Sequence, residues 1–293
     1  DNARADGSIT GKSGAGTIYY QPAVGLAGAD GTLLVRSSFS PSYYTQVDSG
    51  TKSLSTVIAI RARVTLTYSG AMQHLTLASA LIDMLPVTSR GNAVTIDKVT
   101  QSSASTLKSA QNLQINSALT ISKSLAVRSG HLVVKGNFIL PTSASLSVER
   151  DITVSDEGSF IVRSGWTHRS TMTVTDGALH IEPSGTLTLT GTQAVNIGRH
   201  LTVDGRLNYD SKIKADTFSS LGTITARGGT VTVTGDAELG ASAYYTHDRT
   251  NDAAKGILLT VGGKLTVTKG ARINVDYKSS YTRASRNNRY NPS

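Results

Sequence analysis

The chain contains no cysteine among its 293 residues. A fold built from it therefore has no disulfide bond, no thiol nucleophile and no cysteine-based zinc or iron–sulfur site. The sequence also lacks a run of about 18 apolar residues, so we expect no membrane-spanning segment. Aromatic residues make up only 5% and charged residues only 17% of the chain, and Ser, Thr, Gly and Ala fill the difference. That composition suits many tight turns between strands with small side chains.

Motifs for catalysis and metal binding are also scarce. The six histidines show no paired spacing such as HxH or HxxxH, so we expect no metal site and no cofactor. The best candidate cluster of acids near strand ends is formed by Asp204, Asp210 and Asp216, together with Lys212 and Lys214. A polysaccharide-cleaving enzyme would need several such acids to converge on one face. Because these acids stand singly in turn-like segments, the sequence predicts no catalytic residue and no enzyme.

The net charge of +9 would suit a nucleic-acid partner only if the basic residues were clustered. Residues 1–110 hold 9 basic and 6 acidic residues, and residues 111–276 hold 16 and 14. The remaining residues, 277–293, hold 4 basic residues and no acidic one, and we expect them to form a basic, flexible tail. Since the body of the chain is close to neutral, the charge pattern predicts no nucleic-acid partner.

One short phrase recurs between residues 119 and 275: an alternating apolar triplet, a glycine-containing turn and a second alternating triplet. The phrase occurs at residues 125–134, 152–162, 172–181, 201–209 and 265–275. Its leading strands at Leu125, Ile152, Met172 and Leu201 are separated by 27, 20 and 29 residues, which is a period typical of solenoid coils. We therefore predict an all-β fold in which residues 111–276 form a right-handed parallel β-helix of about six or seven coils.

Two further features accompany the coils. The middle residue of each triplet is often Thr, which we expect to form ladders on the outer face. Glycines are expected at the corners, where the chain requires a positive φ or close packing; they are residues 130, 136, 158, 177, 185, 205, 222 and 270. The alternative is an antiparallel β-sandwich, which the Asp–Gly pairs at 176–177 and 204–205 favour locally because such pairs suit hairpins.

The N-terminal part divides into a Gly/Ser-rich arm or cap over residues 1–50 and a β region over 51–110. Residues 58–68 alternate strictly and predict one half-buried strand, with Ile58 and Ile60 on its apolar face. Residues 74–85 predict a strand followed by a turn or a short helical cap before Pro86.

Candidate ligand residues lie in the segment 241–255, which has no strand pattern: they are Tyr244, Tyr245, His247 and Asp248. A loop that projects from a regular solenoid often carries its binding site, and exposed Tyr suits a glycan. Candidate subunit-interface residues are Tyr19, Tyr20, Tyr281, Arg283, Arg286, Arg289 and Tyr290. The single Trp166 follows Gly165 in a predicted loop, where we expect it to pack rather than to bind.

At the phrase Leu-x-Val, Gly, Leu-x-Val, residues 111–276 resemble the parallel β-helix parts of bacterial surface adhesins, such as autotransporter passengers and filamentous-haemagglutinin-type proteins. The resemblance implies a secreted or cell-surface protein with a structural or adhesive function, such as a self-assembling filament or sheath subunit. It also implies a homo-oligomer or polymer, with a cell-surface glycan as a further partner. The alternatives are a carbohydrate-binding or polysaccharide-cleaving β-helix and a phage or injection-system fibre.

Overall fold

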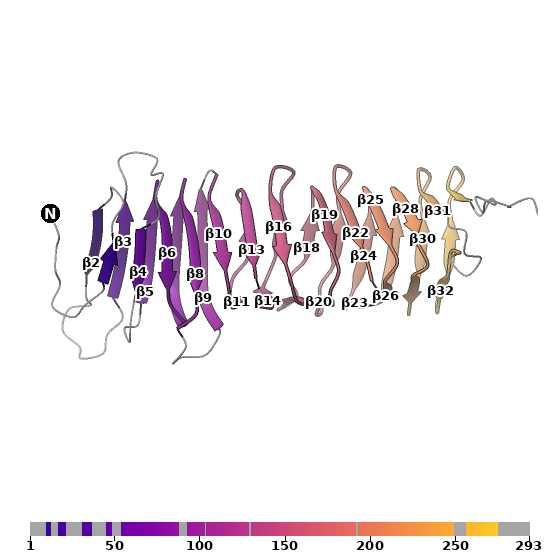
Figure 1. The fold of residues 1–293 in the computed structure, drawn as a ribbon. Helices are drawn as coiled ribbons and strands as arrows, with labels where there is room; N and C mark the ends of the chain where they lie inside the picture. Colours follow the sequence, from indigo (N-terminus) through magenta and orange to yellow (C-terminus); the bar gives the residue numbers. More distant parts are fainter. Residues whose placement is uncertain are drawn as a thin grey trace, which may run out of the picture.

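The computed structural model describes residues 10–12, 17–21, 31–36, 45–48, 54–87, 93–102, 104–128, 130–191, 193–248 and 256–274. Every regular element in these residues is a β-strand, and the strands stack as a β-solenoid of about 10 turns. Figure 1 shows the result as an elongated rod, with successive strands running across it from one end to the other. The predicted all-β parallel solenoid is therefore confirmed.

Four sheets, which we label A to D, contain the paired strands. Sheet A contains β1 (Thr10–Lys12), β4 (Thr45–Asp48), β6 (Arg63–Thr67), β8 (Leu81–Leu85), β10 (Thr106–Ser109), β13 (Ser124–Val127) and β16 (Ser145–Val148). Sheet B contains β2 (Thr17–Gln21), β3 (Gly31–Arg36), β5 (Leu54–Ile60), β7 (Gly70–Ala78), β9 (Ala93–Ser102), β11 (Asn112–Ile115), β14 (Leu132–Lys135), β17 (Ile152–Ser155), β20 (Met172–Val174), β23 (Ala194–Ile197), β26 (Lys212–Ala215), β29 (Thr230–Val233) and β32 (Leu259–Val261).

The other two sheets belong to the C-terminal part. Sheet C contains β12 (Leu119–Thr120), β15 (Phe138–Leu140), β18 (Phe160–Val162), β21 (Leu179–Ile181), β24 (His200–Val203), β27 (Thr217–Ser220), β30 (Ala237–Leu239) and β33 (Leu265–Val267). Sheet D contains β19 (Gly165–His168), β22 (Thr186–Leu189), β25 (Arg206–Tyr209), β28 (Thr223–Ala226), β31 (Tyr244–His247) and β34 (Arg272–Asn274).

The number of strands per turn changes along the rod. From β3 to β10 the chain alternates between sheets B and A, so each turn has two strands. Sheet C begins at β12, and from there each turn has three strands, in the order B, C, and then A or D. Pairing continues through the boundary expected near residue 110, because β9 and β11 are parallel neighbours. The solenoid is thus two-sided in its N-terminal part and three-sided in its C-terminal part.

Strand direction decides between the two predicted architectures. Every strand pair that the structure describes within residues 111–276 is parallel. The antiparallel β-sandwich is therefore wrong, and the Asp–Gly pairs at 176–177 and 204–205 turn corners instead of closing hairpins. Two antiparallel pairs occur at the N-terminal end, where β1 pairs with β4 and β2 pairs with β3.

Alternate residues of each short strand point into the rod and form one continuous core. The rings of Phe138 and Phe160 stack with their centroids 4.7 Å apart, and Trp166 packs against Phe160 at 5.4 Å. Each such fully buried apolar side chain stabilises the fold by about 1.5–3 kcal/mol. Trp166 lies in β19 and not in a loop, but it is buried, so its predicted packing role is confirmed.

Corners that interrupt the alternation explain two wrong predictions in the N-terminal part. The chain turns at Arg61, whose φ is 49°, so residues 58–68 form two strands and not one. As a result Val57 is buried, while Ile58 and Ile60 are only partly buried. Residues 74–85 contain no helical cap, because a second corner at Ser79 (φ 51°) leads directly from β7 into β8.

The corner glycines play the two roles that the sequence predicts. Gly136 and Gly270 have φ values of 91° and 104°, in the left-handed region that side chains rarely adopt. A Cβ at Gly158 would lie 2.0 Å from the carbonyl oxygen of Gly136, and one at Gly177 would lie 1.9 Å from that of Gly158. Stacked corners thus pack backbone against backbone.

The spacing of the leading strands, in contrast, does not measure one turn. Leu125 belongs to sheet A, Ile152 and Met172 to sheet B, and Leu201 to sheet C. Only Ile152 and Met172 are paired neighbours, and one turn takes about 20 residues. Eight strands of sheet B lie within residues 111–276, more than the six or seven coils predicted. With about 10 turns spaced about 4.8 Å apart, the rod is roughly 50 Å long.

Candidate functional site: a groove along one corner

A shallow, open groove with a volume of about 450 Å³ follows the corner between sheets C and D. It is lined by the corner segments 183–186, 204–206 and 221–223, together with Ser242 from the next turn. Each corner has the same design, in which a strand of sheet C ends, a glycine follows and a strand of sheet D begins. The groove therefore crosses successive turns and runs along the rod.

Glycines form the floor of the groove. A Cβ at Gly205 would lie 2.3 Å from the carbonyl oxygen of Gly185, and one at Gly222 would lie 2.0 Å from that of Gly205. Side chains at these positions would push the turns apart, so the floor consists of backbone. A ligand in the groove would meet peptide groups below it and side chains on both sides.

The wall on the side of sheet D is a column of residues in register. Thr186 pairs with Arg206, Arg206 pairs with Thr223, and Thr223 pairs with Tyr244. Arg206 is exposed, and its guanidinium makes no hydrogen bond or ion pair with the part of the chain that the structure describes. This wall therefore presents hydroxyl groups and one cation with five donor hydrogens.

The wall on the side of sheet C carries a carboxylate and an apolar side chain. Nε2 of His180 lies 2.9 Å from Oδ2 of Asp204, so the imidazole donates a hydrogen bond to the carboxylate. Leu221, in the next turn, is 53% exposed. Asp204 and Arg206 flank Gly205, which places an acceptor and a donor on opposite sides of the same corner.

Serine hydroxyls tie the turns together along the groove. Ser184 donates to the carbonyl oxygen of Arg163 at 3.1 Å, and Ser242 donates to that of Leu221 at 2.6 Å. Their oxygens keep lone pairs that can accept hydrogen bonds from a ligand. The groove therefore combines hydroxyls, one carboxylate, one guanidinium and one apolar contact, which suits a neutral polyhydroxylated ligand.

An ion pair lies beside the groove. Arg163 Nε donates to Glu182 Oε2 at 2.8 Å, and this hydrogen bond lowers the pKa of Glu182. The same contact raises the pKa of Arg163. A carboxyl group held ionised in this way does not act as a general acid at neutral pH.

The structure separates the four predicted ligand residues. The segment was predicted to lack a strand, but Tyr244–His247 form β31, so that prediction is wrong. Tyr245 points into the core, where it is 1% exposed and its hydroxyl pairs with that of Tyr209. Its ring is therefore not available to a ligand, and burial raises its pKa.

Of the other three, only Tyr244 lies next to the groove. It is partly buried on the outer face, and Asn274 Nδ2 donates to its hydroxyl at 2.8 Å. Asp248 lies at the following corner, between sheets D and B, where its Oδ2 is 3.1 Å from Nε of Arg227. His247 precedes it, with a ring nitrogen 3.1 Å from the carbonyl oxygen of Asp248.

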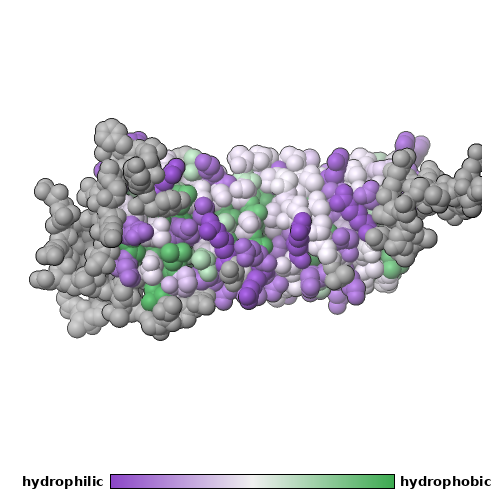
Figure 2. All heavy atoms as spheres, in the orientation of Figure 1, coloured by the Kyte–Doolittle hydropathy of each residue, from purple (hydrophilic) through white to green (hydrophobic). Residues whose placement is uncertain are grey.

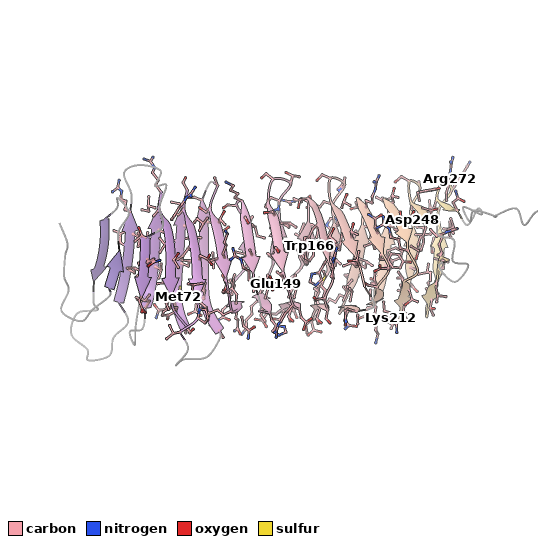
Figure 3. The ribbon with its side chains drawn as sticks, in the orientation of Figure 1. Met72, Glu149, Trp166, Lys212, Asp248 and Arg272 are labelled. Carbon is pink, nitrogen blue, oxygen red and sulfur yellow. The ribbon has the colours of Figure 1, made fainter. Side chains whose placement is uncertain are left out.

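The ionisable group between Asp204 and Asp216 does not converge. Asp204 lies at the corner between sheets C and D, Asp210 between D and B, and Asp216 between B and C. Lys212 and Lys214 lie in β26 on sheet B. Figure 3 shows Lys212 at one edge of the rod, away from Asp248. One turn of the solenoid distributes these side chains around its whole circumference.

The predicted interface residues are described only in part. The backbone of Tyr19 and Tyr20 lies in β2, opposite Leu34 and Leu33, and their side chains lie outside the described part of the structure. Five further predicted interface residues also lie outside the described residues: Tyr281, Arg283, Arg286, Arg289 and Tyr290. Their role stays a prediction.

The groove itself was missed, although Gly185, Gly205 and Gly222 were identified as corner residues. The missing information is the register that places Arg206 above Thr186 and below Thr223. The only signal in the sequence is the recurrence of a corner glycine before each triplet of sheet D, and that signal does not say which corners stack.

No group of three or more His, Asp or Glu side chains in the described ranges is close enough to hold a metal ion. Nor do those ranges contain a helix long and apolar enough to cross a membrane. The chain matches no protein-family model, no curated protein and no solved structure.

Proposed function

We propose that this chain is a non-catalytic structural and adhesive rod that works outside the cell, either secreted or attached to the cell surface. The observation that carries the proposal is the stack of about 10 turns, which holds small polar side chains in columns along a rod of roughly 50 Å. Such a shape suits a protein that presents a long surface to its partners, whereas an enzyme usually encloses its substrate in a cleft.

The outer columns support an adhesive role. On sheet D, Thr167, Thr188, Asn208 and Thr225 follow one another in register. Nδ2 of Asn208 donates to Oγ1 of Thr188 at 3.2 Å, which links neighbouring turns. The face shown in Figure 2 is mostly hydrophilic or neutral in colour, with scattered hydrophobic residues. Regular rows of hydroxyl and amide groups suit contact with a hydrated partner.

The distribution of acids supports a role without catalysis. Asp204, Asp210 and Asp216 occupy three different corners of one turn. A general acid and a general base must both reach one substrate bond, and these three carboxylates face different sides of the rod.

A second candidate function, glycan binding, is favoured by the groove. Asp204 and Arg206 lie on opposite sides of one corner, and Tyr244 lies in the same column as Arg206, two turns further along the rod. Carboxylate, guanidinium and aromatic groups together bind sugars by hydrogen bonds and by stacking. In this form of the proposal the groove binds the glycan, and the length of the rod holds the groove away from the point of attachment.

The test is glycan-array binding of the purified chain combined with electron microscopy. We expect rods of the stated length and retention by a set of neutral polysaccharides. Arg206→Ala should weaken that retention about 10- to 150-fold, since a hydrogen bond to a charged group contributes about 1.5–3 kcal/mol. Lys212→Ala, which removes a cation from sheet B, should leave it unchanged. Release of new sugar ends from any polysaccharide, or equal losses for both variants, would contradict the proposal.

Location requires its own measurement. Intact native cells treated with a membrane-impermeant amine reagent should show labelled lysines of this chain without lysis. Exposed lysines such as Lys212 and Lys264 offer the reactive groups. Labelling that appears only after lysis would overturn the extracellular part of the proposal.

A further inference from the structure

A column of charged side chains follows the corner where the chain leaves sheet A or D and enters sheet B. Each turn contributes the residue that directly follows its strand in sheet A or D, and strand register places these residues one above the other. In chain order the corner column consists of Arg128, Glu149, Arg169, Thr190, Asp210, Arg227 and Asp248. Figure 3 labels Glu149 and Asp248. With turns about 4.8 Å apart, the column is roughly 29 Å long.

The charges of the corner column reverse sign about its centre. Thr190 is the middle residue, with Arg169 one turn before it and Asp210 one turn after it. Glu149 lies two turns before Thr190, and Arg227 lies two turns after it. The two ends of the column, three turns from the centre, carry a cation and an acid in the same way. Each charge therefore has its opposite at the same distance on the other side of Thr190.

The charged groups of the column lie at the surface. Glu149 and Arg169 are exposed, and Asp210 and Arg227 are partly buried. The guanidinium of Arg169 forms no ion pair with another residue that the structure describes. The N–H of Gly191 donates a hydrogen bond to Oδ1 of Asp210, which fixes that carboxylate at the corner. A neighbouring molecule can therefore reach both the cations and the acids of the column.

The columns on both sides of the corner are compatible with such a contact. On the side of sheet D the neighbouring column is uncharged, and it consists of Thr167, Thr188, Asn208, Thr225 and Thr246. On the side of sheet B, Asp151 and Lys212 lie two turns before and one turn after the central turn. The positions that mirror them about the centre hold Thr230 and Thr171, which are neutral. An antiparallel copy would therefore meet no like charge on either side.

The orientation of a second copy decides whether the two columns attract each other. Parallel copies at the same height would place every charge opposite its like. Parallel copies offset by one turn would form four attractive contacts, because Thr190 would occupy two of the six shared positions. An antiparallel copy centred on Thr190 forms six attractive contacts and no repulsive one. The sign reversal about the centre thus favours the antiparallel arrangement.

We propose that two copies of this chain associate side by side, in antiparallel orientation, through the corner column. The two-fold axis lies across the rods at the level of Thr190. Arg169 of one copy then contacts Asp210 of the other, Glu149 contacts Arg227, and each contact occurs twice because the interface is isologous. Exposed ion pairs are individually weak and are screened by salt, so the association should be reversible and should weaken as ionic strength rises.

This inference goes beyond the proposed function and does not rest on it. The groove lies at the corner between sheets C and D, whereas the corner column lies where sheet D is followed by sheet B. A rod whose groove binds no glycan keeps the column unchanged, and a rod that stays monomeric keeps the groove. Failure of one proposal is therefore distinguishable from failure of the other.

The test mixes two charge-reversal variants of the full chain. Arg169→Glu and Asp210→Lys should each weaken self-association at low salt about 10- to 100-fold in sedimentation equilibrium, because one substitution acts at two contacts of a symmetric dimer. An equimolar mixture should recover the association as a heterodimer, since the two reversed charges then face each other and the two unchanged residues do the same. Because only folded chains can recover, this result also excludes loss by unfolding.

A matched pair of variants separates the column from general charge effects. Lys214→Glu and Glu238→Lys reverse exposed charges on sheets B and C, and they should leave self-association unchanged, alone or mixed. A parent chain that stays monomeric at low salt would overturn the proposal, as would a mixture of the column variants that does not recover. Recovery that occurs only when Glu149→Lys is mixed with Arg169→Glu would instead assign the parallel arrangement offset by one turn.

The lack of cysteine in the chain permits a direct test of the axis. Thr190→Cys should give a disulfide-linked dimer on mild oxidation, because the axis brings the two copies of position 190 together and a disulfide requires Cα atoms within about 7 Å. Ser219→Cys, on the outer face of sheet C, should stay unlinked. Equal cross-linking at both positions, or none at position 190 in a chain that dimerises, would overturn the antiparallel arrangement.

Discussion

Two tyrosines that face each other inside the rod provide the sharpest test of the packing. Tyr209 and Tyr245 are 0% and 1% exposed, and their hydroxyls form a hydrogen bond with each other. They lie two turns apart on sheet D, and the residue that stacks on Tyr209 in the intervening turn is the small Ala226. Tyr245 itself stacks on Ile224, so its ring reaches Tyr209 from the neighbouring inward column, past the small Ala226.

Replacing one tyrosine with phenylalanine leaves the other hydroxyl buried without this partner. A buried, unpaired polar group costs about 1–3 kcal/mol, so Tyr209→Phe and Tyr245→Phe should each lower the free energy of unfolding by that amount. The double variant removes both hydroxyls and should be close to the parent chain, because two apolar groups of the same shape replace the pair. The expected coupling energy therefore equals the sum of the two single losses, about 2–6 kcal/mol.

Urea unfolding of the four chains in this double-mutant cycle gives the measurement. Single variants that unfold like the parent, or losses that simply add in the double variant, would show that the two hydroxyls do not meet.

Alkaline pH provides a second test of the same tyrosine pair. Burial raises the pKa of Tyr209 to about 12, so the folded state keeps the proton that the unfolded state loses near pH 10. Stability should fall between these pH values, and less so in the double variant.

Two further predictions concern a corner and a buried imidazole. Gly177→Ala should destabilise the chain by about 1–3 kcal/mol in urea unfolding, because the new Cβ would meet the carbonyl oxygen of Gly158 at 1.9 Å. Gly165→Ala, with no atom within 4 Å of its Cβ, is the control and should not destabilise; equal losses would refute the stacking. Burial lowers the pKa of His168, so stability should decline as pH falls below about 6.5, when the unfolded state binds more protons. Fluorescence of Trp166, the only tryptophan, follows this unfolding, and His168→Leu should remove that part of the decline.

Alternation and corner glycines were sufficient to predict the fold class, because both are local. Each triplet points its first and third residues inward whichever sheet it joins, and glycines such as Gly158 lie where stacked corners pack backbone against backbone. The face to which a triplet belongs is not local. Leu125, Ile152 and Leu201 begin similar triplets, yet they lie in sheets A, B and C. Because the same triplet pattern recurs in every sheet, the sequence does not show how many strands form one turn.

The N-terminal part shows a second limit. Residues 58–68 alternate perfectly in the sequence. Arg61 nevertheless adopts a positive φ, which turns the chain, and a new strand begins at Arg63. The amino-acid sequence does not show where a residue other than glycine adopts a positive φ. The same applies to Ser79, which lies in the segment 74–85 that the sequence predicts as a strand followed by a turn or a short helical cap.

The candidate site was the least predictable feature for a related reason. Tyr244 and Tyr245 look equivalent in the sequence, but the strand places one outside and the other in the core. The groove depends on three corners that are far apart in the chain and adjacent in space. Only the register of sheet D brings Thr186, Arg206 and Thr223 together.

The change from two to three strands per turn has a mechanical consequence. A flat ribbon bends easily across its thin direction, whereas a prism with three walls resists bending about any axis. We therefore expect the segment from β3 to β10 to curve under lateral load while the segment from β12 onward stays straight. Single-particle images sorted by curvature would show this as a bend confined to the N-terminal half. A uniform curve along the whole rod would mean that the third wall adds no stiffness.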